Sequence, residues 1–367
     1  MRHHFLISFM ILAFATCTLT GCRAKEIRQV SVIDEKYVHP IGRTLAEKKD
    51  NQDMLYFANS CSGFAFKATM KEDVHLKFSL YGNTTSTYSA QYAKVVVDQE
   101  LLEVLQIQNG VNDYTLQNAI TKGKHEIQLL KMNEPAFSNM GLLKIYEDNF
   151  VFEEYVTTKT KKIEFYGDSI TCGYGNLTDN TQSFSMETED GTKAYTQLCA
   201  DALGFENSVV SYSGISMALS PFNSDFTMLD RYQTVDSSKA WDFSRYVPDV
   251  IVINIGTNDN TKLRTLSGNA QIDGLNQFYE NLKQMTLDLK TKAPQAKFVF
   301  AYNMMLPISD GLVTCMESVK RELDKENEST AYLLEFTPEG KGADGHPSLE
   351  GHKQSAEQLK SFIETIL

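Results

Sequence analysis

The hydrophobic pattern of this chain changes its period near residue 157, so a single architecture does not fit both halves. Between about residues 37 and 155, apolar and polar residues alternate in short runs such as Val74–Leu80. Turn-forming pairs such as Asn109-Gly110 separate these runs. A period of two in short segments without a helical stretch is typical of strands in a β-sandwich. We therefore predict an all-β sandwich domain over residues 37–155.

After about residue 160 the chain alternates strand-like and helix-like segments. The strand-like runs are Lys162–Gly167, Ser208–Tyr212, Val250–Gly256, Lys297–Asn303 and Ala331–Phe336. Apolar residues spaced by three and four predict amphipathic helices near residues 275–289 and 348–366. Such alternation is typical of a parallel sheet with helices on both faces. We predict an α/β domain with a five-stranded parallel sheet over residues 160–367.

The amino terminus has the features of an export signal. Arg2 and two histidines precede an apolar stretch over residues 5–18, which is shorter than the roughly 20 residues needed to span a bilayer. The stretch ends in Leu19-Thr20-Gly21-Cys22, which looks like a bacterial lipobox. We expect a lipoprotein signal peptide over residues 1–21, lipidation of Cys22 and a tether over residues 22–36. Arg23 provides no aspartate retention signal, which favours the outer membrane or cell surface.

Charge and cysteine content exclude several partners. The formal net charge of −12 argues against a nucleic-acid-binding surface. The cysteines outside the signal region show no CxxC pair and no metal-ligand spacing. We expect no cofactor and no metal.

The sequence Gly167-Asp168-Ser169 follows the first strand of the predicted α/β domain. A serine there lies at the carboxyl end of a strand, where open α/β sheets bind ligands, and near a helix amino terminus that favours developing negative charge. Either Asp168 or Ser169 can instead serve only as a helix cap. If Ser169 is a nucleophile, it needs a base, because a serine hydroxyl is inert at neutral pH without one.

His346 is the candidate base. The α/β segment contains two histidines, His346 in the loop after the fifth strand and His352 inside the last helix. Pro347 constrains the loop around His346, and His352 is expected to be a packing or surface residue. Asp344 is within about 7 Å of His346 along an extended chain, so it can orient the imidazole only in a cramped geometry. A backbone carbonyl can do the same, so the orienting group stays open.

Two further strand ends supply donors for an oxyanion. Gly214 follows the second strand, where a glycine can bring a bare N–H close to a ligand. Asn258 follows the third strand, and its side-chain amide can donate. A turn glycine and an asparagine helix cap are the structural alternatives. Polar groups at the ends of four parallel strands nevertheless indicate one site.

These blocks carry a family resemblance. Gly167-Asp168-Ser169, Gly214, Gly256–Asp259 and His346 resemble the four blocks of the SGNH (GDSL-like) hydrolase superfamily. The stretches at 167–176, 241–250 and 342–347 resemble carbohydrate esterase family 2, the acetyl esterases of plant polysaccharides. The resemblance covers nearly the whole mature chain. It implies a flavodoxin-like hydrolase domain after an amino-terminal jelly-roll sandwich.

The resemblance also implies roles for individual residues. Ser169 would attack an acetyl carbonyl, and His346 would act as base and then acid. The oxyanion would be held by the Ser169 N–H, the Gly214 N–H and the Asn258 side chain. Most of the superfamily places its acid three residues before the histidine, where this chain has Ala343. In family 2 a main-chain carbonyl can replace the acid, and the expected one here is that of Gly345.

The function expected from these features is an exported, lipid-anchored serine esterase. Its substrate would be an acetylated plant polysaccharide such as xylan or glucomannan, or derived oligosaccharides, and it would act through an acetyl-enzyme. One alternative is an esterase or lipase for lipid or simple acyl esters. Another is a non-catalytic surface lipoprotein that binds glycan. Trp241, Tyr174 and Tyr212 are aromatic residues that can stack on sugar rings or pack in the core.

Overall fold

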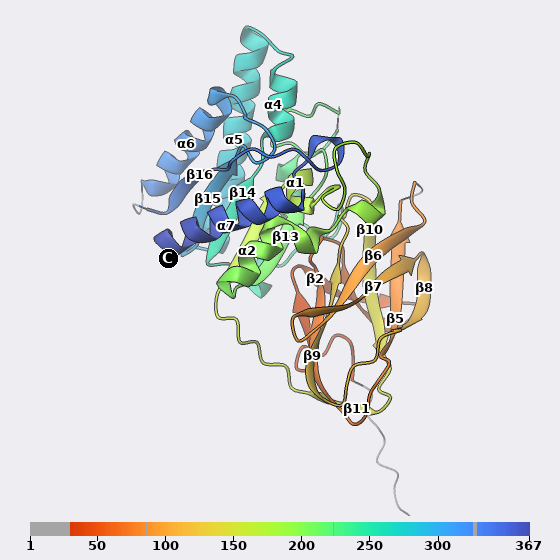
Figure 1. Cartoon of the computed structure of the whole chain (residues 1–367). Coiled ribbons are helices and arrows are strands. Elements are labelled where there is room, and N and C mark those ends of the chain that lie inside the picture. Colours follow the sequence, from red (N-terminus) through yellow and green to blue (C-terminus); the bar gives the residue numbers. More distant parts are fainter. Residues whose placement is uncertain (1–29, 86, 223, 326–328) are drawn as a thin grey trace, which may run out of the picture.

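The computed structural model describes residues 30–85, 87–222, 224–325 and 329–367. A strand-rich amino-terminal part, orange and yellow in Figure 1, lies beside an α/β part coloured green to blue. The expected signal peptide, the Cys22 lipidation site and most of the expected tether lie outside the described residues. Among the described helices, none combines the length and the apolarity needed to cross a membrane.

The strand-rich part is built from two antiparallel sheets. In the order of the sheet, the first contains β1 (Val38–Ile41), β4 (Gly63–Met70), β9 (Gly123–Lys131), β6 (Ala90–Val97) and β7 (Glu100–Gln108), with β11 (Phe150–Glu153) also paired to β4. The second contains β2 (Thr44–Lys49), β3 (Gln52–Phe57), β10 (Ser138–Ile145), β5 (Lys77–Thr84) and β8 (Gly110–Thr115). Residues from both sheets, including Phe57, Phe64 and Phe78, form one buried core. The predicted all-β part is confirmed, and we call it the sandwich.

The packed part of the chain begins before residue 37. Val32 belongs to the sandwich core and is 4% exposed. The Val30 N–H donates to the Glu147 carboxylate at 2.7 Å. Residues 30–36, which belong to the segment expected to be a tether, therefore pack on the sandwich.

The α/β part contains the predicted five-stranded parallel sheet. Its order is β13 (Glu206–Ser211), β12 (Lys162–Gly167), β14 (Val250–Asn254), β15 (Lys297–Tyr302) and β16 (Ala331–Glu335). Numbered along the chain, this is the order 2-1-3-4-5 of flavodoxin-like sheets. The strands are all parallel, but the order in which they are added reverses between β12 and β14. The carboxyl end of β12 is therefore where such sheets bind ligands.

Helices cover both faces of this sheet. The helices α2 (Tyr195–Leu203) and α7 (Leu349–Ile366) share one apolar core with the sheet, and α5 (Asn269–Lys292) and α6 (Asp310–Asp324) share the other. The predicted stripe on α5 is confirmed, since Phe278, Leu282, Met285 and Leu289 are buried. The short helices are α1 (Ser169–Cys172), α3 (Met228–Arg231) and α4 (Thr257–Leu263), with 3-10 turns η1 (Met186–Thr188), η2 (Gly191–Lys193), η3 (Phe243–Arg245) and η4 (Ala343–Gly345).

The sandwich and the α/β part share a buried interface. Met54, Tyr56 and Leu143 of the sandwich pack with Val235 and Trp241 of the α/β part. Arg43, in the turn between β1 and β2, is fully buried there. Its guanidinium donates to the Glu164 carboxylate at 3.0 Å and to the Tyr166 hydroxyl at 2.7 Å. It also donates to the carbonyls of Tyr232 and Thr234, so each of its three nitrogens donates within the protein.

Candidate active site

The serine lies on a tight turn between β12 and α1. Asp168 caps α1 by accepting a hydrogen bond from the Ile170 N–H at 3.0 Å, and Ser169 is the first helical residue. Gly167 has no room for a side chain, because a Cβ there would lie 2.0 Å from the Thr171 hydroxyl and 2.8 Å from the Asn254 carbonyl oxygen. Asp168 is the cap, and the cap presents Ser169 at the edge of the sheet.

Ser169 and His346 form a hydrogen-bonded pair. Ser169 Oγ lies 2.8 Å from His346 Nε2, although 177 residues separate them in the chain. Burial lowers the pKa of His346 below its ordinary value of about 6.5, so the imidazole is neutral at pH 7. A neutral imidazole at this distance can accept the serine proton. The predicted pairing of nucleophile and base has the required geometry.

The orienting group differs from both sequence-based expectations. His346 Nδ1 lies 3.2 Å from the Ala343 carbonyl oxygen. When Nε2 accepts from Ser169, Nδ1 carries the proton and donates to this carbonyl. The orienting group is therefore neither the Asp344 carboxylate nor the Gly345 carbonyl. The reason is the 3-10 turn η4, which also directs the His346 N–H to the Ala343 oxygen at 2.9 Å.

Asp344 serves a different part of the site. Its backbone is in the left-handed region at φ 50°, and its side chain is exposed. The carboxylate accepts hydrogen bonds from the Tyr174 hydroxyl at 3.3 Å and the Phe184 N–H at 3.2 Å. The Tyr174 ring stacks on Phe184 at 4.1 Å between centroids and lies 4.3 Å from the His346 ring. Asp344 thus holds an aromatic wall beside His346 and does not contact the imidazole.

Two backbone N–H groups are free to bind an oxyanion. Ser169 stands at the amino terminus of α1, and Gly214 follows β13 in the left-handed region at φ 74°. Within the described part of the chain, no group accepts a hydrogen bond from either N–H. Buried or half-buried N–H groups are normally paired, so these two, which follow the neighbouring strands β12 and β13 at one edge of the sheet, are available to a ligand.

Asn258 lies next to the Gly214 turn. Its amide nitrogen donates one hydrogen bond to the Ile215 carbonyl at 2.8 Å. An amide has two N–H groups, so one remains for a ligand. Asp259, which sequence reasoning did not single out, is fully buried and accepts from the N–H groups of Met217, Ala218 and Leu219 at 2.9, 2.8 and 2.7 Å. The pair Asn258-Asp259 therefore anchors the loop that carries Gly214.

The remaining candidates are structural or peripheral. His352 is fully buried, accepts from the Tyr195 N–H at 3.1 Å, and has its pKa lowered to about 3 by burial. The prediction that it is a packing residue is confirmed. Trp241 and Tyr212 belong to apolar cores, so of the three aromatic candidates only Tyr174 reaches His346.

One cluster could offer ligands to a metal. Single ligand atoms of Glu134, Cys172 and Glu189 lie within 4.8 Å of one another, and all three residues are buried. Lys131 is buried beside these groups. Burial lowers the pKa of Lys131 to about 7, and the charges of Glu189, Glu134 and Cys172 partly offset that decrease. A protonatable amine already lies among these side chains, which argues for a buried network of ionisable groups. The sequence of the loop that carries Glu134 does not predict this cluster, because its one acidic residue forms no recognisable motif.

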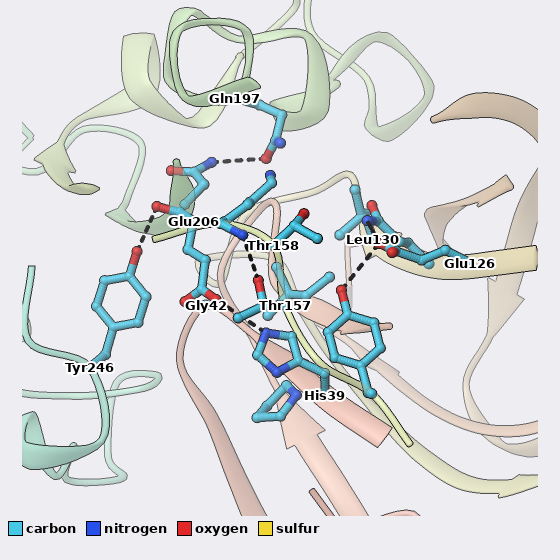
Figure 2. A pocket seen from close by; sticks show the side chains of 15 residues that line it. His39, Gly42, Glu126, Leu130, Thr157, Thr158, Gln197, Glu206 and Tyr246 are labelled. Carbon is cyan, nitrogen blue, oxygen red and sulfur yellow. Dashed lines mark hydrogen bonds and ion pairs between the residues drawn. The ribbon is translucent and has the colours of Figure 1, made fainter. Parts of the chain in front are cut away.

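A pocket whose lining side chains are shown in Figure 2 lies at the end of the parallel sheet opposite Ser169. It has a volume of about 70 Å³ and is lined by residues of both parts, including His39, Tyr155 and Glu206. His39 stacks on Tyr155 at 4.6 Å and lies 3.6 Å from the Glu206 carboxylate. Glu206 opens β13, whereas the site lies beyond its far end, about 16 Å away at 3.3 Å per residue. The pocket lacks a serine–histidine pair and is separate from the candidate site.

Known proteins resemble the chain in sequence and in fold. Residues 165–354 match the GDSL-like Lipase/Acylhydrolase family. The chain is 26% identical to the cellulase/esterase CelE of Acetivibrio thermocellus over 308 residues, which is 80% of this chain and 37% of that protein. It is 26% identical to an acetylxylan esterase / glucomannan deacetylase of Cellvibrio japonicus over 229 residues, 60% of this chain and 61% of that protein. The matches thus span less than two thirds of either relative.

Solved structures share the fold over nearly the full described chain. A family two carbohydrate esterase from Clostridium thermocellum, in complex with cellohexaose, has a TM-score of 0.78 at 24% identity and covers 89% of this chain and 98% of its own. An acetyl xylan esterase from Butyrivibrio proteoclasticus has a TM-score of 0.78 at 17% identity, with 91% and 96% covered. The family model spans the serine, the histidine and the strands that carry them, and the chain therefore belongs to the GDSL-like lipase/acylhydrolase family.

Proposed function

We propose that this protein is a serine esterase that removes O-acetyl groups from plant cell-wall polysaccharides through an acetyl-enzyme. The observation that carries the proposal is the 2.8 Å contact between Ser169 Oγ and His346 Nε2 beside two free N–H donors. A nucleophile, a base and oxyanion donors at one edge of a sheet are the parts that acyl transfer requires.

In the first half of the reaction, Ser169 Oγ attacks the acetyl carbonyl while His346 Nε2 takes the serine proton. The carbonyl oxygen becomes an oxyanion held by the N–H groups of Ser169 and Gly214 and the free N–H of the Asn258 amide. Collapse breaks the bond between the acetyl carbon and the sugar oxygen. The imidazolium returns its proton to that oxygen, and the deacetylated sugar leaves.

In the second half, His346 accepts a proton from water, and the resulting hydroxide attacks the acetyl-serine. Collapse of the second tetrahedral oxyanion breaks the bond between the acetyl carbon and Ser169 Oγ, and the imidazolium returns its proton to Oγ. Acetic acid leaves and ionises to acetate in solution. The Ala343 carbonyl accepts from Nδ1 throughout, so it steadies the imidazolium with a dipole instead of a full charge. The catalytic unit is a dyad of Ser169 and His346 oriented by the backbone.

The acetylated glycan substrate is supported by the names of the relatives and by one feature of the site. Two relatives are a cellulase/esterase and an acetylxylan esterase / glucomannan deacetylase, and a structure of similar fold binds cellohexaose. The aromatic wall of Tyr174 and Phe184 beside His346 offers half-buried apolar ring surface, which suits the apolar CH groups of a sugar. Acetylated xylan and glucomannan are therefore the proposed substrates.

The proposal includes the organisation and location of the chain. We assign residues 37–155 to a jelly-roll domain and residues 160–367 to the hydrolase domain. The lipobox-like Leu19–Cys22 supports an exported protein with a lipid on Cys22, at the outer membrane or cell surface.

Metabolic labelling with an alkyne fatty acid tests the anchor. Label should enter the wild type and be absent from Cys22→Ser.

The decisive experiment measures acetate released from acetylated xylan and glucomannan by wild type and Ser169→Ala. We expect release by the wild type only. Turnover of long-chain esters without acetate release would favour a lipase or general esterase. Glycan binding without turnover of any ester would favour a binding protein. Equal activity in Ser169→Ala would exclude this site.

A further inference from the structure

The loop between β9 and β10 of the sandwich sends a buried carboxylate into the α/β part. Glu134 lies in this loop and is 0% exposed. Its Oε2 accepts from the Ser213 N–H at 2.6 Å, and its Oε1 accepts from the Ser213 hydroxyl. One side chain of the sandwich therefore holds both the backbone and the side chain of the residue before Gly214.

Ser213 and Gly214 are the central residues of a β-turn. The turn runs from Tyr212 to Ile215, whose N–H donates to the Tyr212 carbonyl at 3.3 Å. Gly214 has φ 74°, the value that a type II turn requires at its third residue. Types I and II differ in ψ of the second residue and φ of the third, the two dihedrals that rotate the peptide between them. That peptide carries the Gly214 N–H, so its rotation decides where this donor points.

The loop that carries Glu134 is itself held from several sides. The buried Lys131 ammonium donates to the Asn133 carbonyl at 2.5 Å, and the Asn133 amide donates to the Met186 carbonyl at 2.8 Å. The Glu134 N–H donates to the Glu189 carboxylate at 3.2 Å. Two of these partners, Met186 and Glu189, belong to the α/β part. The carboxylate therefore projects from a fixed support, which is what positioning a donor requires.

We propose that Glu134 is a positioning residue for ester hydrolysis, which the sandwich contributes to the active site. By holding Ser213 at two points, it keeps the Ser213–Gly214 peptide in the orientation that aims the Gly214 N–H at the oxyanion. The inference rests on the proposed function, because it assumes that the Gly214 N–H stabilises an oxyanion. It gives the sandwich a part in the chemistry in addition to any role in binding glycan.

Three variants separate geometry from charge. Glu134→Ala removes both contacts, and we expect kcat on 4-nitrophenyl acetate to fall roughly 100-fold with KM nearly unchanged, the lower end of the loss for one oxyanion donor. Glu134→Gln keeps the shape, accepts from the Ser213 N–H and donates to its hydroxyl, so we expect it to retain activity within roughly tenfold. Glu134→Asp keeps the charge but is one methylene shorter, so its kcat should fall below that of Glu134→Gln.

A transition-state analogue supplies a readout that a purely structural role would not change. A boronic acid becomes tetrahedral on Ser169, so its affinity should fall in parallel with kcat in Glu134→Ala. Titration of Ser169 with a fluorophosphonate gives the active fraction, to which rates are normalised. The matched control is Tyr56→Phe, which removes another hydrogen bond across the interface, that to Asp236 at 2.5 Å. It should keep wild-type kcat and boronate affinity.

The outcomes separate the two proposals. Wild-type kcat per active site in Glu134→Ala, or lost kcat with unchanged boronate affinity, would overturn the role of Glu134. If Glu134→Ala does not fold, kcat in Glu134→Asp equal to that of Glu134→Gln would overturn it. Wild-type activity on 4-nitrophenyl acetate without acetate release from glycans would overturn only the proposed substrate. A wild type inactive on every ester would overturn both.

Discussion

The carboxyl edge of the parallel sheet and the interface with the sandwich both contain buried polar groups, but they satisfy them differently. At the interface, the Arg43 guanidinium has partners in Glu164, Tyr166 and two carbonyls. At the edge, the N–H groups of Ser169 and Gly214 have no acceptor among the described residues. Unmade hydrogen bonds in native proteins are costly and uncommon. The hydrogen-bonded Arg43 therefore stabilises the interface, whereas the two free N–H groups at the edge of the sheet are available to a ligand.

Removing the proposed base should have the largest effect on activity, and it tests directly whether the carboxyl edge of the parallel sheet is the active site. We expect His346→Ala to reduce kcat/KM by roughly 10⁶-fold, as when a unit of nucleophile and base is broken. The free energy of unfolding should change little by comparison, because Ser169 and His346 lie at the edge of the core. Initial rates on an acetyl ester and a urea titration give both quantities. If His346→Ala lost stability but kept activity, the carboxyl edge of the sheet would have a structural role and not a catalytic one.

Removing Arg43 should lower the stability of the protein and leave its activity nearly unchanged, the opposite of His346→Ala. Arg43→Met leaves the Glu164 carboxylate buried without its cation, which typically costs about 3–5 kcal/mol of unfolding free energy. The chain has one tryptophan, Trp241, and the Arg43 guanidinium lies 5.5 Å from its ring, so intrinsic fluorescence reports unfolding at this interface. Activity per folded molecule should stay close to wild type.

The control for Arg43→Met is Lys48→Met, which removes a solvent-exposed ion pair with Asp53. It should leave the denaturation midpoint unchanged, because exposed pairs contribute little. A loss of kcat in Arg43→Met that exceeds its loss of folded protein would show that the interface ion pair also shapes the active site.

The buried His352 makes stability depend on pH. Its pKa is about 3 when folded and about 6.5 when unfolded, so between these values the unfolded chain binds a proton that the native state excludes. The contribution of the neutral His352 to the free energy of unfolding is fully present above pH 6.5. It falls by up to roughly 1.4 kcal/mol per pH unit as the pH decreases toward 3. His352→Gln should reduce this slope in denaturant titrations over that range. An identical slope in wild type and variant would contradict the assignment.

Replacing Asp344 should have the smallest effect and sharpens the description of the dyad. Asp344→Asn keeps an oxygen for Tyr174 and Phe184, so we expect kcat/KM to fall less than about tenfold, against roughly 10⁴-fold when a true triad aspartate is replaced. The negative charge of Asp344 raises the pKa of His346, so its removal should move the acid limb of the pH–rate profile to lower pH. A loss near 10⁴-fold would make Asp344 a triad member.

Much of the fold follows from local patterns. The strand and helix periods predict the sandwich, the five parallel strands and the α5 stripe, because each depends only on which face of an element is buried. The pair Ser169 and His346 is also predictable, because the carboxyl ends of parallel strands meet at one edge. The group that orients His346 is harder to predict from the sequence, because the choice among Ala343, Asp344 and Gly345 depends on the backbone conformation of one turn, η4.

The sequence by itself determined the two-part architecture, the nucleophile and the base, since local periodicity and the chemistry of single side chains carry that information. Only the tertiary structure decided that Ala343 orients His346, that every nitrogen of Arg43 donates in the interface, and that Glu134 reaches Ser213 from 79 residues away. The Arg43 and Glu134 contacts join segments whose separation in the chain says nothing about their distance in space, and the Ala343 contact depends on the backbone conformation of the η4 turn. Each arises from how a loop or turn is packed, and isolated charged residues such as Arg43 and Glu134 give no periodic signal.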